Sequence, residues 1–235
     1  IGGQPRSRLA AIDGASGLAT GWNPNAYGAV FSLAAHGGIV YAAGFFTGLG
    51  GVVRNNLAAI DIVTGQVTAW DPDANSEVLA LAAEGGTLYA GGSFSGVGGQ
   101  TRNGLAAFAT GSGLDTGWNP NVSGRVSTLA TSGSLVYAGG LFTDVGGQPR
   151  ANLAALDGAT GVPTSWNPGT DGEVFAIAPS GGTVYVGGTF SSAGGVARNN
   201  LAALGAVTGA PSAWNPIANG TIRAIDPNCG RVLVG

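Results

Sequence analysis

The stretch of sequence that decides the fold runs from Glu173 to Pro216. It reads Glu173-Val-Phe-Ala-Ile-Ala-Pro-Ser-Gly-Gly182, then Thr183-Val-Tyr-Val-Gly-Gly-Thr-Phe190, then Gly194-Gly-Val-Ala-Arg-Asn-Asn-Leu-Ala-Ala-Leu204, then Thr208-Gly209, and closes with Trp214-Asn-Pro216. The pattern recurs along the whole chain, and five tryptophans mark it at intervals of 48 residues: Trp22, Trp70, Trp118, Trp166 and Trp214. A fixed period of this size is typical of a repeat architecture.

Each copy of the pattern contains four short β-prone segments. None of them shows the 3.6-residue spacing of apolar residues that is typical of a helix. The first has the form Val-x-x-Leu-Ala, the second surrounds a Val-Tyr-x-Gly-Gly motif, the third reads Leu-Ala-Ala-x-Asp, and the fourth ends in the tryptophan. Gly-Gly pairs such as Gly37-Gly38 and Gly85-Gly86 join the first two segments, and they suit tight hairpins that need positive φ. The sequence therefore predicts four antiparallel strands per unit and no helices.

Four-stranded units repeated at this length describe the blades of a β-propeller. We expect one domain over residues 1–235, an all-β five-bladed propeller; a solenoid of stacked sheets is the alternative. Four blades are expected at approximately 29–70, 77–118, 125–166 and 173–214. The last blade is expected to combine residues 7–22 with residues 222–235, so that strands from both termini close the ring.

The length of the chain supports this closure. Five units of 48 residues make 240 residues, and the chain has 235, so one short loop is missing between the two ends. Closure predicts that Ile1 and Gly235 lie within roughly 20 Å of one another, the reach of a short loop. Since Ile1 is not a methionine, we also expect that the chain is part of a longer product.

Composition excludes several classes of function. Charged residues make up 9% of the chain and the net charge is -3, which argues against a nucleic-acid partner. Apolar runs are too short to span a bilayer. His36 and Cys229 are the only histidine and the only cysteine, so neither a zinc site nor a nucleophilic triad is expected. We predict no cofactor, no metal and no catalytic residues.

The combined motif Leu-Ala-Ala-Ile-Asp, Thr-Gly, Trp-Asn-Pro, Val-x-x-Leu-Ala and Val-Tyr-x-Gly-Gly-x-Phe resembles the delta-sixty β-propeller repeat of bacterial surface and secreted proteins. The resemblance covers essentially the whole chain. It implies a propeller in an extracellular, cell-surface or periplasmic location, often inside a longer protein, and it implies no defined activity. The stretch from Ala59 to Trp70 is also similar to the repeat of quinoprotein-type propellers, in which the tryptophan docks between neighbouring blades.

Two repeated residue types are candidates for either structure or binding. An arginine recurs at one register, at Arg6, Arg54, Arg102, Arg150 and Arg198. Guanidinium groups suit carboxylate and phosphate ligands, but we favour a structural role in which each arginine ties its long loop to backbone carbonyls or to an aspartate such as Asp61 or Asp157. The five tryptophans could present rings to sugars, yet burial between blades is the favoured reading.

The repeat varies most at the start of the first segment, where ligand contacts are expected if that strand is innermost. The candidate ligand-binding residues are Glu77, Arg125, Glu173 and Arg223. Arg223 also breaks the pattern of Phe31, Leu79 and Phe175 at its register. Two carboxylates here could imitate a glycosidase pair, but nothing else in the chain supports that chemistry.

These observations predict a non-catalytic binding or structural scaffold module of a bacterial surface or secreted protein. Its expected partners are other protein domains or subunits. The alternative is a multivalent glycan-binding, lectin-like propeller, and a glycosidase-like propeller ranks below it.

Overall fold

A computed structural model describes residues 1–228 and 230–235, and all its regular elements are β-strands. Cys229 lies outside the described residues. Since the described residues contain no helix, they include none long and apolar enough to cross a membrane. The sheets are antiparallel throughout, as the sequence predicts.

Four repeat units follow one another along the chain, and we number them 1 to 4. Unit 1 contains β1 (Ala26–His36), β2 (Ile39–Leu49), β3 (Val52–Val53) and β4 (Leu57–Asp61). Unit 2 contains β5 (Val78–Glu84), β6 (Thr87–Gly92), β7 (Gly96–Val97), β8 (Gln100–Thr101) and β9 (Leu105–Ala109). Unit 3 contains β10 (Val122–Ser132), β11 (Leu135–Val145), β12 (Gln148–Pro149) and β13 (Leu153–Asp157). Unit 4 contains β14 (Val174–Ser180), β15 (Thr183–Gly188), β16 (Ser192–Ala193), β17 (Val196–Ala197) and β18 (Leu201–Gly205), and the hairpin of β19 (Ile225–Asn228) and β20 (Arg231–Val234) comes last.

The same local chemistry builds each unit. The first two strands form a hairpin whose turn is a Gly-Gly pair in units 1, 2 and 4, and both glycines have positive φ. The third strand pairs with the second in one register, so that Ala58 faces Ala42 in unit 1 and Ala202 faces Val186 in unit 4. The third strand is buried on both faces, which its small Leu-Ala-Ala residues allow.

The predicted fourth strand is wrong for every unit. Its place is taken by an isolated bridge, such as Ile60 with Val67 and Leu204 with Pro211. Proline has no N–H to donate, and Pro163 and Pro211 stand at the bridge itself in units 3 and 4. The segment therefore makes one pair with the third strand and then turns away toward its tryptophan.

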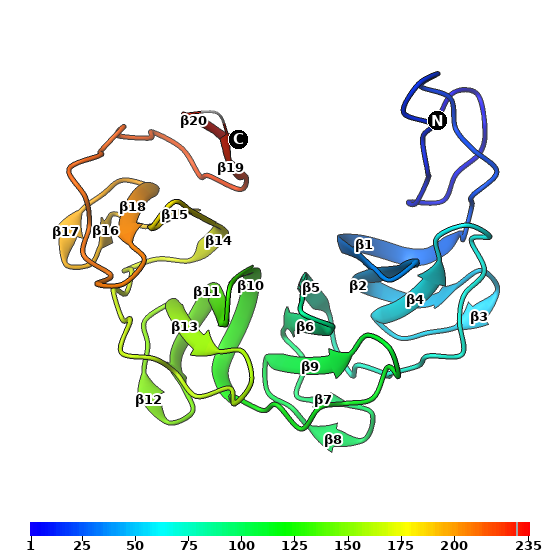
Figure 1. The fold of residues 1–235 in the computed structure, drawn as a ribbon, viewed down its shortest axis with the longest axis horizontal. Helices are drawn as coiled ribbons and strands as arrows, with labels where there is room; N and C mark the ends of the chain where they lie inside the picture. The colour runs from blue at the N-terminus through cyan, green and yellow to red at the C-terminus, as the bar shows by residue number, and fades with distance from the viewer. Residues whose placement is uncertain (229) are drawn as a thin grey trace.

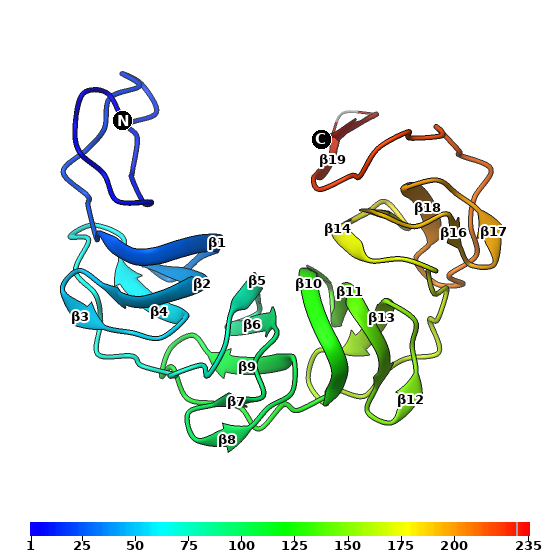
Figure 2. The ribbon, with the colours of Figure 1, turned by 180° about the vertical axis from the view of Figure 1, so that it is seen from behind.

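The units stand side by side along an open arc, with their first strands on the concave side (Figure 1, Figure 2). β1 contacts β5, β5 contacts β10, β10 contacts β14, and β14 contacts β19. The arrangement is propeller-like, and it places one face of every first strand toward a common centre.

Tryptophans join each unit to the next. The indole Nε1 of Trp118 donates to the Asp157 carbonyl at 3.2 Å, and that of Trp166 donates to the Gly205 carbonyl at 2.9 Å. Four of the five rings also meet a tyrosine of their own unit edge to face, as in Tyr137 and Trp166 at 5.2 Å between centroids. Such ring pairs stabilise the fold by about 0.5–1.5 kcal/mol beyond the contribution of the apolar area that they bury.

The two ends of the chain do not meet in this structure, contrary to the expected closure by strands from both termini. The hairpin β19–β20 forms a sheet of its own, and the described N-terminal residues contribute the single bridge of Ile12 with Ala19. The N-terminal segment and the hairpin lie on opposite sides of the opening (Figure 1). Each half makes its local turn without help, whereas joining them requires pairing between residues more than 200 positions apart, which carries the entropy of closing a long loop.

Candidate functional site

The repeated arginines are engaged inside their own units. In all five repeats Nη1 donates to the carbonyl of the preceding residue. In four repeats Nη2 donates to the carbonyl fourteen residues ahead, as from Arg54 to Thr68 at 2.7 Å and from Arg150 to Thr164 at 2.6 Å. Each arginine thus fastens the long loop to the segment that carries the tryptophan.

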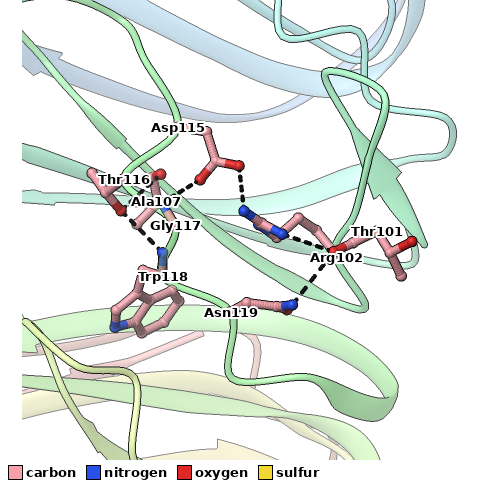
Figure 3. A network of polar contacts seen from close by, with 8 residues as sticks. All are labelled: Thr101, Arg102, Ala107, Asp115, Thr116, Gly117, Trp118 and Asn119. Carbon is pink, nitrogen blue, oxygen red and sulfur yellow. Dashed lines mark hydrogen bonds and ion pairs between the residues drawn. The ribbon is translucent and has the colours of Figure 1, made fainter.

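Arg102 departs from this pattern (Figure 3). Its Nη2 donates to the Asp115 carboxylate at 2.6 Å, and Asp115 also accepts from the Gly117 backbone N–H at 2.8 Å. Arg54 makes a longer ion pair with Asp71 at 3.3 Å. The acidic partners are therefore Asp71 and Asp115, and the expected Asp61 and Asp157 instead cap their own turns through Thr64 and Thr160.

The tryptophans do not present a row of free rings. Trp22, Trp118 and Trp166 are buried, and Trp70 and Trp214 are partly buried. A cavity of about 530 Å³ does lie beside Trp70. However, Tyr41 and Phe108 approach the Trp70 ring at 5.4 and 5.3 Å, and the two carboxylates of this cavity, Asp71 and Asp115, are held by arginines. This arrangement lacks the open aromatic platform that a sugar site needs.

A second cavity, of about 430 Å³, lies where the first strands converge, and we call it the central pocket. Five of its lining residues are spaced by 48 positions, one from each repeat. The remaining two come from the register two residues earlier. The full lining is Phe31, Leu79, Arg125, Ser127, Glu173, Phe175 and Arg223.

In units 2 and 4 the side chain at this register stands between two buried neighbours. In β14, Val174 and Ala176 are buried in the sheet while Phe175 between them is only partly buried. Successive strand residues point to opposite faces, so the residue at this register is turned away from the core and toward the centre of the arc. The register reads Phe, Leu, Ser, Phe and Arg, so one repeated position carries four different residue types.

One wall of the central pocket is an ion pair. Arg125 Nη2 lies 2.7 Å from one Glu173 carboxylate oxygen and 2.8 Å from the other. The Ser127 hydroxyl donates to the same carboxylate at 2.6 Å. The Glu173 side chain is 11% exposed and the Arg125 side chain is 40% exposed, so the arginine is the partner that faces the open space.

The other wall is cationic and aromatic. The Arg223 guanidinium carbon lies 4.5 Å from the centre of the Phe175 ring. Arg223 has no acidic partner among the described residues, so this contact leaves its N–H groups open to solvent. Phe31, half exposed, and Leu79 supply the apolar part of the lining.

The structure thus brings together three of the four residues predicted to bind a ligand. Arg125, Glu173 and Arg223 line the central pocket, whereas Glu77 lies outside its lining and accepts a hydrogen bond from the Ser93 hydroxyl at 3.0 Å. Sequence reasoning did not assign Phe31, Leu79, Ser127 and Phe175 to the site. Their common spacing from Arg223 was the available signal.

The carboxyl groups with a lowered pKa all lie outside the central pocket. Hydrogen bonds from Ser191 hold the pKa of Asp171 at about 2, aided by the Ser192 backbone N–H. Hydrogen bonds from the Thr64 and Thr160 residues of their turns lower the pKa of Asp61 and Asp157. These shifts belong to turns that shape the units. No group of three or more His, Cys, Asp or Glu side chains able to hold a metal ion occurs within residues 1–228 and 230–235.

Comparisons with known proteins place the fold alone. No family model matches the chain, and no curated protein matches it. The computationally designed Ika4 protein is similar in structure, with a TM-score of 0.51, 20% identity, and coverage of 83% of this chain and 95% of Ika4. The designed Ika8 protein has a TM-score of 0.56 at 15% identity and covers 88% of this chain and 68% of its own.

A chain of the Mitotic Checkpoint Complex is also similar, with a TM-score of 0.55 at 16% identity. That alignment covers 80% of this chain and 51% of the checkpoint chain, so this chain spans about half the length of that one. At 15–20% identity, these three similarities show the fold alone. The protein is therefore an all-β, propeller-like repeat chain.

Proposed function

We propose that the protein is a non-catalytic binding or scaffold module of a bacterial surface or secreted protein, and that its binding face is the central pocket. The proposal rests on a difference between the polar residues that repeat in every unit and those that line the central pocket. The repeated arginines, tryptophans and turn aspartates bond within and between units, while the central pocket gathers side chains that differ from repeat to repeat. The resemblance to delta-sixty repeats supports the location outside the cytoplasm.

We further propose that the working form is a closed five-bladed ring. Two apolar residues exposed at the two ends, Ile12 and Val234, have counterparts that the complete units bury. Ile12 is 46% exposed, and its counterparts Ile60 and Leu204 are fully buried. Val234 is 47% exposed, and its counterpart Ala42 is fully buried. Placing residues 9–13 beside β20 in the register of the other units would cover both.

Two side chains of unit 4 support the same closure. In three of the other repeats the tryptophan Nε1 donates to a carbonyl 39 residues ahead. For Trp214 this position falls in the next repeat of the ring, which is the first repeat of the chain, and the equivalent residue there is Asp13. Tyr41 and Tyr89 donate to carbonyls 69 residues ahead, and the equivalent for Tyr185 is Gly14. No described residue accepts a hydrogen bond from Trp214 Nε1. The equivalent acceptor, the Asp13 carbonyl, belongs to the N-terminal segment on the other side of the opening (Figure 1).

Both half-blades are already docked on the arc. Trp22 Nε1 donates to the Asp61 carbonyl of unit 1 at 3.1 Å. The Ile222 backbone N–H donates to the Gly188 carbonyl of unit 4 at 3.2 Å, and the Ile222 side chain is buried. A ring without edges would also remove strand edges that promote aggregation.

The expected partners are other protein domains or subunits that approach the central pocket. A lectin-like module with five equivalent sugar sites gains no support, because the tryptophan rings pack between units. A glycosidase-like module would need two carboxylates around one site. The central pocket is lined by one, Glu173, which is held by Arg125.

The function is tested by immobilising the chain and exposing it to the secreted and surface proteins of the source bacterium and to a glycan array. We expect capture of a protein partner that Phe31→Ser abolishes and that Val207→Ser leaves unchanged. Val207 is the matched control because it is exposed on a turn of unit 4 and does not line the pocket.

The same preparation is assayed with chromogenic nitrophenyl glycosides. Turnover that disappears in Glu173→Gln would contradict the non-catalytic assignment. Glycan binding lost on replacement of the tryptophans, with no effect of Phe31→Ser, would favour the lectin instead.

A further inference from the structure

We infer that the central pocket binds one small carboxylate that carries an apolar group, such as an aryl or branched alkyl acid. This inference rests on the proposed binding role of the same pocket and names the chemistry of its ligand. It concerns residues 31, 79, 125, 127, 173, 175 and 223, all of which lie on units 1 to 4 or on the segment docked against unit 4.

The charge in the pocket selects an anion of low charge. Arg125 and Arg223 contribute two positive charges, and Glu173 contributes one negative charge, which leaves an excess of one positive charge. The Glu173 carboxylate is covered and satisfied by Arg125 and Ser127. A singly charged carboxylate balances the excess, whereas a phosphate monoester would bring more negative charge than the pocket can neutralise.

Arg223 is the cation available to that carboxylate. Its guanidinium carbon lies 4.5 Å from the centre of the Phe175 ring, and this cation–π contact uses none of its N–H groups. A guanidinium held in this way presents a planar fork that matches the two oxygens of a carboxylate. The exposed side chain of Arg125 offers a second cation at the opposite wall.

The apolar residues define the rest of the ligand. Phe31, Leu79 and Phe175 line the same cavity, and Phe31 is half exposed to it. Covering these surfaces supplies the hydrophobic part of the binding free energy, which a bare acetate or chloride ion cannot provide. Since the register carries four different residue types around one pocket, the pocket is asymmetric, and one ligand per chain is expected.

The test uses hydrocinnamate as the probe and follows binding by calorimetry and by amide chemical shifts. Hydrocinnamyl alcohol has the same ring and chain length without the charge, and propionate has the carboxylate without the ring. We expect hydrocinnamate to bind at one site per chain, about 10-fold or more tightly than either, because a charge-assisted hydrogen bond and apolar burial each contribute. Glycyl-glycyl-phenylalanine tests whether the bound carboxylate is the C-terminus of a peptide. Tighter binding of this peptide than of hydrocinnamate would identify the ligand as a peptide C-terminus. Weaker binding would identify it as a free acid.

Arg223→Gln should weaken hydrocinnamate about 10-fold or more, and Arg223→Lys should retain part of the affinity because it keeps the charge without the fork. Arg231→Gln makes the same charge change on the neighbouring β20 outside the pocket and should leave the affinity unchanged. Thermal unfolding of each variant separates loss of binding from loss of folding.

Three results would overturn the inference. They are equal binding of the acid and the alcohol, equal effects of Arg223→Gln and Arg231→Gln, and the absence of saturable hydrocinnamate binding at millimolar concentration. None of these bears on capture of a protein partner or on glycoside turnover, so failure of the ligand assignment and failure of the proposed function are told apart.

Discussion

Single residues of the turns carry the pH dependence of the protein. Asp171 accepts hydrogen bonds from the Ser191 and Ser192 backbone N–H groups, each at 2.8 Å, and from the Ser191 hydroxyl. These bonds favour the charged form and hold the pKa of Asp171 at about 2, below its ordinary value of 3.8. A lowered folded-state pKa stabilises the fold above the ordinary value, and this stabilisation is lost as the pH falls from about 4 toward 2.

Asp171→Asn should therefore lower the free energy of unfolding at pH 7 and have a smaller effect near pH 2.5. Urea unfolding at both pH values measures the difference. Asn75 occupies the equivalent position in unit 2, and its side-chain oxygen accepts from the Ser95 and Gly96 backbone N–H groups. Asn75→Asp is the reciprocal control, because it should acquire the pH dependence that Asp171→Asn removes; an unchanged difference at both pH values would contradict the account.

The repeated arginine is the second determinant at this scale. Arg150 is buried and donates to the carbonyls of Pro149 and Thr164 and to the Gln148 side chain. We expect Arg150→Met to lower the free energy of unfolding by about 2–3 kcal/mol, because two carbonyls lose a charged donor. Arg231→Met, on an exposed position, should change it by less than about 0.5 kcal/mol. Equal effects of the two variants in urea unfolding would show that the arginine register does not hold the loop.

Elements show how far the pattern of residues decides the local structure. The hairpin, the Gly-Gly turn and the buried Leu-Ala-Ala strand are local, and alternation with turn chemistry predicts them correctly. The prediction of a fourth strand is wrong in all four units, and in units 3 and 4 Pro163 and Pro211 remove an N–H group at the point of pairing. The central pocket is predicted in part. Charge variation marks Arg125, Glu173 and Arg223, whereas Phe31, Leu79 and Phe175 carry no charge that would distinguish them from other apolar strand residues.

The tryptophan hydrogen bonds between neighbouring units can be tested by substitution. Trp166→Phe removes the hydrogen bond to the Gly205 carbonyl and should lower the free energy of unfolding by about 1 kcal/mol. In a closed ring, Trp214→Phe should have a similar effect, because Trp214 would donate to Asp13. In the open arc Trp214 makes no such bond among the described residues, and the substitution should have little effect. Urea unfolding of the two variants side by side distinguishes these cases.

At the scale of the whole molecule, the repeat length predicts a ring and the structure presents an open arc (Figure 2). Periodicity specifies how each unit is built and how it follows the one before it, since these contacts lie within about one unit along the chain. Closure is different in kind, because it joins the first residues to the last and depends on the balance between loop-closure entropy and the burial of Ile12 and Val234. The proposal of a closed ring rests on the exposure of Ile12 and Val234 and on the free indole N–H of Trp214 among the described residues.

In the closed ring that we propose, residues 9–13 pair with β20 of the same chain. In the register of Ala58 with Ala42, and of Ala202 with Val186, Ala10 faces Val234. Facing residues of an antiparallel pair are close enough for a disulfide. The decisive measurement is disulfide formation in the variant Ala10→Cys/Val234→Cys with Cys229→Ser, analysed by non-reducing electrophoresis and mass spectrometry. Ala10→Cys/Leu141→Cys, with the second cysteine exposed on unit 3, is the control pair. The account predicts an intramolecular disulfide in a monomer for the first pair and none for the control, whereas a first pair that stays reduced, or that links only separate chains, would contradict it.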